Sequence, residues 1–271
     1  MTDDMRVRDD RPRRRRRKRR RRHPFRRLLF AVCAVAVIGG VFAWGTSSHV
    51  GQHHEIKKFA REHGLSLSDY LESIISLYER NPETKEFVLH YPLEYGQDHE
   101  VDLSDYRDTE GVPLFMQWDS RWGYLDYGND VVGLTGCGPV SLAMAGYAVT
   151  KDDVTFRPDN VIKFAIESGY CVPGSGSSWT LISEGGKRLG LDVVQIPLDK
   201  DRIIKNLEVG NPIICIMGPG VFTSSGHFIV LTGTENGKFR INDPNSYQNS
   251  QRLWDYEEFQ DQIRNLWVVR D

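Results

Sequence analysis

Cysteine and histidine are both scarce in this chain, with four cysteines and eight histidines among 271 residues. Four cysteines are too few for a small fold held together by disulfides. The 25 glycines follow no fixed period, which excludes a collagen, and a hydrophobic content of 39% excludes a wholly disordered chain. The sequence has no internal repeat, no His-Glu-x-x-His pattern and no Cys/His spacing typical of zinc sites. We therefore expect neither a metal nor a cofactor.

The formal net charge of -2 conceals two parts of opposite charge. Residues 1–27 hold 15 Lys/Arg against 4 Asp/Glu, whereas the other 244 residues hold 20 against 33. Residues 13–22 are an unbroken run of ten cations, and residues 28–44 are all apolar or glycine. A cation block directly before an apolar run is the positive-inside signature of a membrane span. We therefore predict a polybasic cytoplasmic tail over residues 1–27, a transmembrane signal anchor over residues 28–45, and an extracytoplasmic remainder.

Two alternatives to the anchor remain open. Cleavage of a signal peptide near Val41-Phe42-Ala43 is one, although the apolar run exceeds the usual signal core of about 7–15 residues. Nucleic-acid binding by the cation block is the other, but its place before the apolar run favours contact with anionic membrane lipid. We therefore expect a single-pass plasma-membrane protein with membrane lipid as a partner and no nucleic acid. The sequence does not determine an oligomeric state.

The rest of the chain divides into a segment of residues 46–111 and a domain of residues 112–271. In the first, Ser66 and Asp69 have the spacing of a capping box, apolar residues then recur every three to four positions, and Asn81-Pro82 is a helix stop. We predict a stalk with a small helical segment there. The second part is long enough to bury one compact core.

Within residues 112–271, helical patterns come first and strand patterns dominate the end. The predicted helices cover residues 139–148, 160–168, 179–189 and 200–209, and the predicted strands cover residues 192–196, 212–217, 228–232, 238–241 and 266–269. The segment Glu235-Asn236-Gly237-Lys238 lies between two apolar runs and indicates a β-hairpin. This order predicts an α+β domain with an antiparallel sheet.

The strongest chemical signal is Cys137, in the segment Leu-Thr-Gly-Cys-Gly-Pro-Val-Ser. It lies between two glycines at the expected start of an apolar helix, with Pro139 in the first turn, where a missing N–H does no harm. Free N–H groups and the positive end of the helix dipole would stabilise a thiolate, the nucleophilic form. A packed or disulfide-bonded cysteine is the alternative. Cys171 and Cys215 could also pair, although the apolar surroundings of Cys215 favour a buried reduced thiol.

A cysteine nucleophile needs a base, and the base needs an orienting partner. His227 is the sole histidine after residue 112 and precedes an apolar strand pattern. If the hairpin turn has three or four residues, Asp243 lies opposite His227 or one position away, close enough to hold one ring nitrogen. Asn242 and Asn245 are weaker candidates for the same role. An acyl-transfer site also needs an oxyanion hole, for which the side-chain amide of Gln117 is a plausible donor beside the cysteine N–H.

Four motifs in this order resemble a known family. They are Val-Pro-Leu-Phe-Met-Gln-Trp-Asp-x-Arg-Trp around Gln117, Gly-Cys-Gly-Pro around Cys137, Gly-His-Phe-Ile-Val-Leu around His227 and Asn-Asp-Pro around Asp243. Together they resemble papain-like cysteine peptidases of the peptidase family thirty-nine-like group, related to double-glycine leader peptidases that process bacteriocins. The resemblance covers about residues 112–260. It implies a nucleophile at Cys137, a general base and acid at His227, an orienting residue at Asp243 and an oxyanion-hole donor at Gln117.

The resemblance also implies a papain-like fold, in which the cysteine helix packs on an antiparallel sheet. We thus expect a membrane-anchored extracytoplasmic cysteine peptidase that acts on a peptide or protein substrate through an acyl-enzyme. Bacteriocin exporters carry membrane and ATPase domains after their peptidase, but this chain has one predicted span and no phosphate-binding Gly-x4-Gly-Lys-Ser/Thr loop. Leader cleavage coupled to export is therefore not expected. The alternatives are a cell-wall peptide hydrolase or acyl transferase with the same residues, and a non-catalytic surface binding module, for which four such residues are unnecessary.

Overall fold

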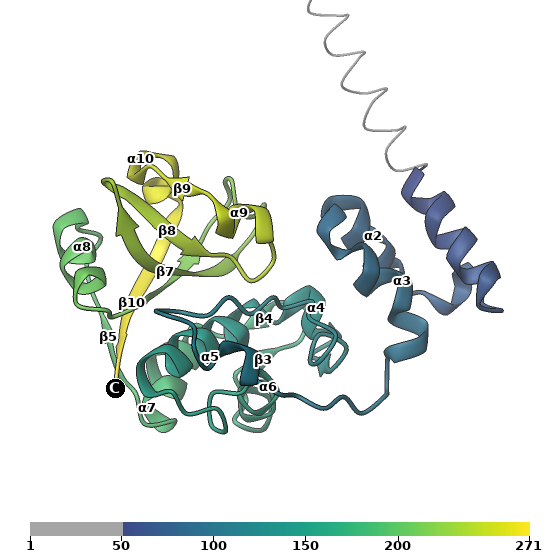
Figure 1. The fold of residues 1–271 in the computed structure, drawn as a ribbon, viewed down its shortest axis with the longest axis horizontal. Coiled ribbons are helices and arrows are strands. Elements are labelled where there is room, and N and C mark those ends of the chain that lie inside the picture. Colours follow the sequence, from purple (N-terminus) through teal and green to yellow (C-terminus); the bar gives the residue numbers. More distant parts are fainter. Residues whose placement is uncertain (1–50) are drawn as a thin grey trace, which may run out of the picture. The chain divides into compact units, whose positions relative to one another are not determined.

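The computed structural model describes residues 51–271, so the predicted cytoplasmic tail and membrane span lie outside the described residues. Within residues 51–271, no helix is long and apolar enough to cross a bilayer. These residues belong to one compact unit. A helical segment comes first, and a mixed region of helices and strands follows it (Figure 1).

The helical segment ends at residue 94 and packs around an apolar core that it shares with residues of the mixed region. Residues 51–62 are helical, and the elements that follow are η1 (Leu67–Asp69), α2 (Glu72–Arg80), η2 (Pro82–Thr84) and α3 (Lys85–Glu94). Ser66 and Asp69 form the predicted capping box. Helix α2 ends directly before Asn81, because the residue before a proline is driven into extended backbone. The buried core of this segment includes Ile56, Ile74, Leu77 and Val88, together with Tyr124 and Val131 of the mixed region.

A six-stranded antiparallel sheet forms the centre of the mixed region, in the order β5-β10-β6-β7-β8-β9. The strands are β5 (Asp192–Gln195), β6 (Ile213–Met217), β7 (His227–Glu235), β8 (Lys238–Asn242), β9 (Leu253–Trp254) and β10 (Ile263–Arg270). Every residue of β6 is buried. Its Ile214 and Ile216 belong to one core and its Cys215 and Met217 to another. Alternate side chains of a strand point to opposite faces, so both faces of this sheet are covered.

Helices cover the two faces of the sheet (Figure 1). On one side lie α5 (Cys137–Thr150) and α6 (Pro158–Glu167), and α8 (Lys200–Glu208) and α10 (Tyr256–Phe259) share the core on the other side. Residues 138–147 of α5 are all buried, as expected for a helix that is apolar on every side. The smaller elements are η3 (Ser104–Tyr106), β1 (Asp126–Tyr127), β2 (Asp130–Val131), α4 (Val132–Thr135), β3 (Cys171–Val172), β4 (Gly176–Ser177), η4 (Leu181–Gly185), α7 (Gly186–Arg188), α9 (Tyr247–Gln251) and η5 (Gln260–Gln262).

The α+β prediction is confirmed, and each predicted strand is present in the sheet. The predicted length of the hairpin turn is wrong. Glu235 pairs with Lys238, so the turn has only two residues, Asn236 and Gly237, with φ of 52° and 77°. Two successive residues with positive φ suit the right-handed twist of the strands, and Asn-Gly adopts them readily. An irregularity between Leu231 and Gly233 then shifts the pairing by one residue.

Candidate active site

Cys137 is the first residue of α5 and is partly exposed. As the first residue of a helix it has a backbone N–H without an acceptor inside that helix. Close packing explains the glycines on both sides. A Cβ on Gly136 would lie 2.7 Å from the carbonyl oxygen of Val132, and one on Gly138 would lie 2.5 Å from Ser177 Oγ. The close approach expected around the thiol is thus made by α4 and β4.

His227 and Asp243 meet at neighbouring ends of β7 and β8. The ring Nε2 of His227 donates to Asp243 Oδ1 across 2.7 Å, and the two side chains are 8% and 2% exposed. A carboxylate only accepts, so Nε2 carries the proton and Nδ1 is left for Cys137. The predicted register, with Asp243 opposite His227 or one position away, is wrong, because Val230 pairs with Asn242 and Asp243 lies beyond the last pair of the ladder. The expected contact forms from this neighbouring position.

The Asp243 carboxylate is held by three donors. Its Oδ1 also accepts from the N–H of Asn245 at 2.9 Å, and its Oδ2 accepts from Nδ2 of Asn249 at 2.8 Å. Asn245, a weaker candidate for the orienting role, thus acts on Asp243 through its backbone. The side chain of Asn242, the other weaker candidate, donates to the carbonyl of Pro113 at 2.9 Å and ties β8 to the preceding loop.

Electrostatics favours an ion pair between the thiol and the imidazole. Burial raises the pKa of the Cys137 thiol, but the hydrogen bond and the charge of His227 outweigh it, so this pKa lies below its ordinary value. Burial lowers the pKa of His227, but the charge and hydrogen bond of Asp243 and the contact with Cys137 raise it well above its ordinary value. For Asp243, the pKa is lowered because His227, Asn249 and the Asn245 N–H outweigh burial. These shifts favour a thiolate on Cys137, an imidazolium on His227 and a carboxylate on Asp243.

The other described cysteines are different. Cys171 in β3 and Cys215 in β6 are free thiols, so the pair considered from the sequence is not formed. Burial raises the pKa of both, and Cys215 is fully buried, as its apolar surroundings indicate. Among the cysteines that the structure describes, Cys137 alone has a lowered pKa.

Gln117 lines the same cleft as Cys137 and His227 and is only 3% exposed. Its Nε2 donates to the carbonyl of Gly133 at 2.8 Å, and its backbone N–H donates to the carbonyl of Pro244, beside Asp243, at 2.7 Å. The bond to Gly133 fixes the orientation of the amide, because the opposite orientation would set two oxygens against each other. An amide nitrogen has two hydrogens, so one remains for an oxyanion.

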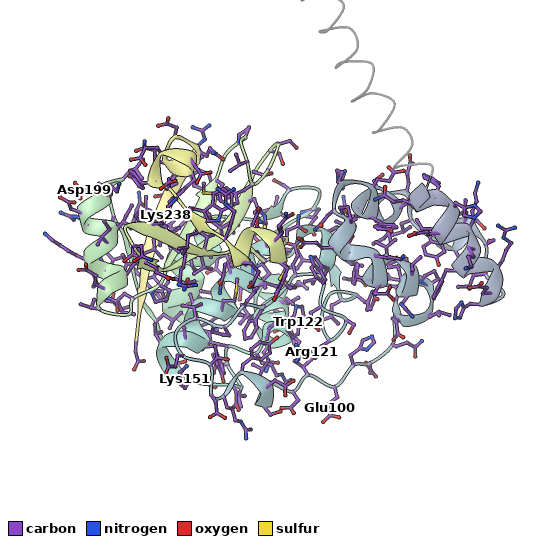
Figure 2. All side chains as sticks on the ribbon, turned by 45° about the horizontal axis from the view of Figure 1, so that its top comes forward. Glu100, Arg121, Trp122, Lys151, Asp199 and Lys238 are labelled. Atoms are coloured by element: carbon purple, nitrogen blue, oxygen red, sulfur yellow. The ribbon has the colours of Figure 1, made fainter. Side chains whose placement is uncertain are left out.

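The loop after Gln117 is held rigidly by Arg121. Its guanidinium binds both carboxylate oxygens of Asp119, at 2.9 and 2.7 Å. It also lies 4.7 Å from the ring centre of the buried Trp122, next to it in Figure 2. A paired guanidinium over an aromatic ring is strongly restrained. These contacts restrain the loop that carries the oxyanion-hole candidate.

The cleft around Cys137, His227 and Gln117 has a volume of about 660 Å³. Residues 174–177 of the β3–β4 hairpin and residues 222–226 before β7 contribute to its lining. Both loops are rich in glycine, serine and threonine, and Trp179, 46% exposed, adds an apolar surface. Such a cleft has room for several residues of an extended peptide beside the thiol.

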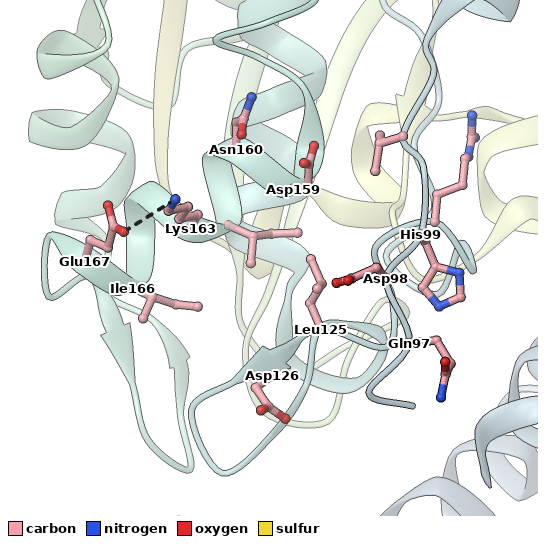
Figure 3. Close-up of a pocket in the computed structure, with 13 residues that line it drawn as sticks. Gln97, Asp98, His99, Leu125, Asp126, Asp159, Asn160, Lys163, Ile166 and Glu167 are labelled. Atoms are coloured by element: carbon pink, nitrogen blue, oxygen red, sulfur yellow. Dashed lines mark ion pairs between the residues drawn. The ribbon is translucent and has the colours of Figure 1, made fainter. Parts of the chain in front are cut away.

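A second cavity of about 510 Å³ lies beside α6 and the segment 97–101 (Figure 3). Its rim includes charged side chains, among them Lys163 and Glu167, which form an ion pair at 3.9 Å. No cysteine is among its described lining residues. Across residues 51–271, no group of His, Cys, Asp or Glu side chains is arranged to hold a metal ion.

Sequence reasoning missed Asn249, which holds the second oxygen of Asp243. It belongs to α9, whose start is capped by Ser246 accepting from the N–H of Asn249 at 3.2 Å. A serine followed three residues later by asparagine, directly after Asn-Asp-Pro, indicates a short capped helix beside the carboxylate. That signal was available in the sequence, but the side-chain contact was not.

A match to a known protein family shows to which proteins this chain is related. The model of the Peptidase_C39 like family matches residues 109–269, a range that includes Gln117, Cys137, His227 and Asp243. The chain belongs to this family. Membership confirms the resemblance to papain-like peptidases and supports a function of the cysteine-peptidase type.

Solved structures of C39-like proteins are similar to parts of the chain. A candidate C39-like peptidase from Bacillus anthracis is 17% identical with a TM-score of 0.41, over 60% of this chain and 96% of that one. The peptidase domain of Streptococcus ComA, a bifunctional ABC transporter involved in quorum sensing, is 20% identical with a TM-score of 0.38, over 59% and 98% of the two chains. The same domain of Streptococcus mutans ComA in complex with an inhibitor is 18% identical with a TM-score of 0.37, over 59% and 99%. No curated protein matches the chain significantly.

Proposed function

We propose that this protein is a cysteine peptidase that hydrolyses a peptide or isopeptide bond through an acyl-enzyme on Cys137. The observation that carries the proposal is the array in which His227 contacts both the Cys137 thiol and the Asp243 carboxylate at the wall of a cleft. A nucleophile, a base and an orienting group in contact are the parts that covalent acyl transfer needs. A non-catalytic binding module has no use for a thiol with a lowered pKa.

Acylation begins when the Cys137 thiolate attacks the carbonyl carbon of the scissile bond. The electron pair of the carbonyl moves to its oxygen, and the N–H of Cys137 and the free amide hydrogen of Gln117 stabilise the resulting oxyanion. The oxyanion then collapses, and the proton on His227 Nδ1 moves to the leaving nitrogen as the C–N bond breaks. An amine leaves, and a thioester remains on Cys137.

Deacylation uses the same groups in reverse. Neutral His227 takes a proton from a water molecule, whose oxygen attacks the thioester carbonyl. The oxyanion collapses, the C–S bond breaks, and the carboxylic acid product leaves with the thiolate and imidazolium restored. Asp243 stays ionised throughout and stabilises the imidazolium, which explains why both of its oxygens are held by donors.

Alkylation of the full-length protein tests this proposal without a known substrate. Iodoacetamide at about pH 6 should label Cys137 much faster than Cys171, which is also partly exposed and serves as an internal control. His227→Ala should remove the difference. Equal labelling of the two thiols in the unsubstituted protein would refute the ion pair. Cleavage of a mixed peptide library, with Cys137→Ala as the control, then identifies the scissile bond.

We also propose that the protein is held in the plasma membrane by residues 28–45, with the peptidase outside the cell. The support for this proposal is the ten-cation run of residues 13–22, which is separated by five residues from a run of 17 apolar or glycine residues. Protease added to intact cells that express the protein should digest the region after residue 50 and spare the N-terminal tail. Complete protection of the C-terminal region would refute this topology.

A further inference from the structure

The helical segment before the family match contributes to the cleft. The matched region begins at residue 109, whereas Arg80 is the last residue of α2. Arg80 nevertheless lines the cleft together with Cys137 and His227. A segment that the family pattern does not include therefore forms part of the wall of the candidate active site.

Hydrogen bonds attach the chain next to Arg80 to the loop that carries Asp243. Nδ2 of Asn81 donates to the carbonyl of Asn245 at 2.6 Å. The Glu83 carboxylate accepts from the N–H groups of Tyr247 at 2.6 Å and Gln248 at 2.9 Å. These N–H groups begin α9 and have no acceptor within that helix. The contacts of Asn81 and Glu83 with this loop therefore hold the backbone at Arg80 beside the cleft.

The charge of Arg80 has no counterpart in the cleft. Among the described residues that line it, Arg80 is the only Lys, Arg, Asp or Glu, and the Cys137–His227 pair is the only other charged group. Arg80 is exposed, and within residues 51–271 no hydrogen bond or ion pair occupies its guanidinium. The nearby acids are engaged elsewhere, Glu79 with His53 at 2.8 Å and Glu83 with α9. A guanidinium is always charged and offers five donors that match a carboxylate.

A general excess of positive charge does not explain why Arg80 lies at the cleft, because the chain after residue 27 carries 20 Lys/Arg against 33 Asp/Glu. An unpaired cation in the neutral cleft of an acidic protein would attract an anionic group of a ligand. We propose that Arg80 is a specificity-determining residue that binds a carboxylate of the peptide substrate. This inference rests on the proposed peptidase function for the nature of the ligand. The carboxylate belongs to an acidic side chain or to a free C-terminus, and the experiment distinguishes the two.

Binding to the full-length Cys137→Ala protein tests Arg80 independently of catalysis. Three libraries of N-acetylated hexapeptides built from Gly, Ala, Ser and Leu serve as probes: one with a single Glu and an amidated C-terminus, one with Gln in its place, and one with Gln and a free C-terminus. Enrichment on the immobilised protein, read by mass spectrometry, should favour one of the two carboxylate libraries over the Gln amide by about two- to fivefold at low salt.

Arg80→Gln should abolish this preference, and Arg80→Lys should retain part of it. Arg202→Gln removes an equal charge from the exposed surface of α8 and should leave the preference intact. Equal enrichment of all three libraries, or a preference that survives Arg80→Gln, would overturn the proposal.

Alkylation of Cys137 gives a second measurement. The rate with anionic iodoacetate, divided by the rate with neutral iodoacetamide, should fall about twofold or more in Arg80→Gln at low salt and stay constant in Arg202→Gln. The two proposals then fail separately. An unreactive Cys137 with Arg80-dependent enrichment refutes the peptidase alone, whereas a reactive Cys137 with enrichment and rate ratio independent of Arg80 refutes the role of Arg80 alone.

Discussion

The side-chain amide of Asn249 donates to Asp243 Oδ2 across 2.8 Å, while Asp243 Oδ1 accepts from His227 at 2.7 Å. The carboxylate that orients the imidazole is thus itself oriented by α9. Because Glu83 binds the first N–H groups of α9, the helical segment before residue 95 is linked through this helix to the imidazole of His227. Glu83, the backbone and Asn249 side chain of α9, Asp243 and His227 therefore form one continuous chain of contacts.

Asn249→Ala should lower kcat about tenfold, because a hydrogen bond to a charged group contributes about 1.5–3 kcal/mol and only part of that reaches the ring. Loss of this donor raises the pKa of Asp243, which weakens its support of the imidazolium. The pKa of His227 then falls and that of Cys137 rises, so the bell-shaped pH profile should narrow from both sides. Gln248→Ala, an exposed neighbour on α9, is the control. An unchanged profile in Asn249→Ala would contradict the positioning role.

The reactivity of Cys137 toward iodoacetamide should follow its thiolate fraction. Because the pKa of this thiol is lowered, its reactivity should persist below the ordinary range for thiols and disappear only as the pH falls through the lowered pKa. His227→Ala removes the hydrogen bond and the charge that lower this pKa against burial, so the inflection should move to higher pH. The measurement is the alkylation rate of Cys137 between about pH 4 and 10. An inflection at the same pH in both proteins would contradict the ion pair.

Gln117→Ala should reduce kcat/KM for peptide cleavage about 10²- to 10³-fold, the usual effect of losing one oxyanion-hole donor. Alkylation of Cys137 by iodoacetamide forms no oxyanion, so its rate should change far less. The comparison of these two rates separates the loss of an oxyanion donor from a general disturbance of the site. A parallel fall in both rates would assign Gln117 a structural role through its bond to Gly133.

Gly138→Ala should destabilise the fold by about 1–3 kcal/mol, the usual effect of overpacking. The new Cβ would lie 2.5 Å from Ser177 Oγ and 2.7 Å from its Cβ, so the β3–β4 hairpin would have to move. Both atoms belong to one side chain, and the double substitution Gly138→Ala with Ser177→Gly should recover part of the loss. Urea unfolding measures the effect. Gly233→Ala is the control, because a Cβ there meets no atom within 4 Å.

The part of the site that could be predicted rests on local patterns. A cysteine between glycines and before Pro139 indicates a nucleophile at a helix start, and the absence of any other histidine after residue 112 leaves His227 as its base. The fold class could be predicted in the same way, because the alternation of buried residues and the Asn-Gly turn depend on neighbours in the chain. The register could not, since Gly233 permits a bulge within the strand but does not fix where the pairing shifts.

The sequence by itself determined the chemistry available to this protein, namely a cysteine between glycines, a single histidine after residue 112 and an Asp-Pro segment, in the order of a known family. Residue type, order and spacing are properties of the sequence and can be identified without knowledge of the conformation. Only the tertiary structure decided that Asn249 holds Asp243 and that Arg80 lines the cleft with Cys137. Contacts of this kind depend on how apolar faces far apart in the chain pack together, and short spacing carries no information about them.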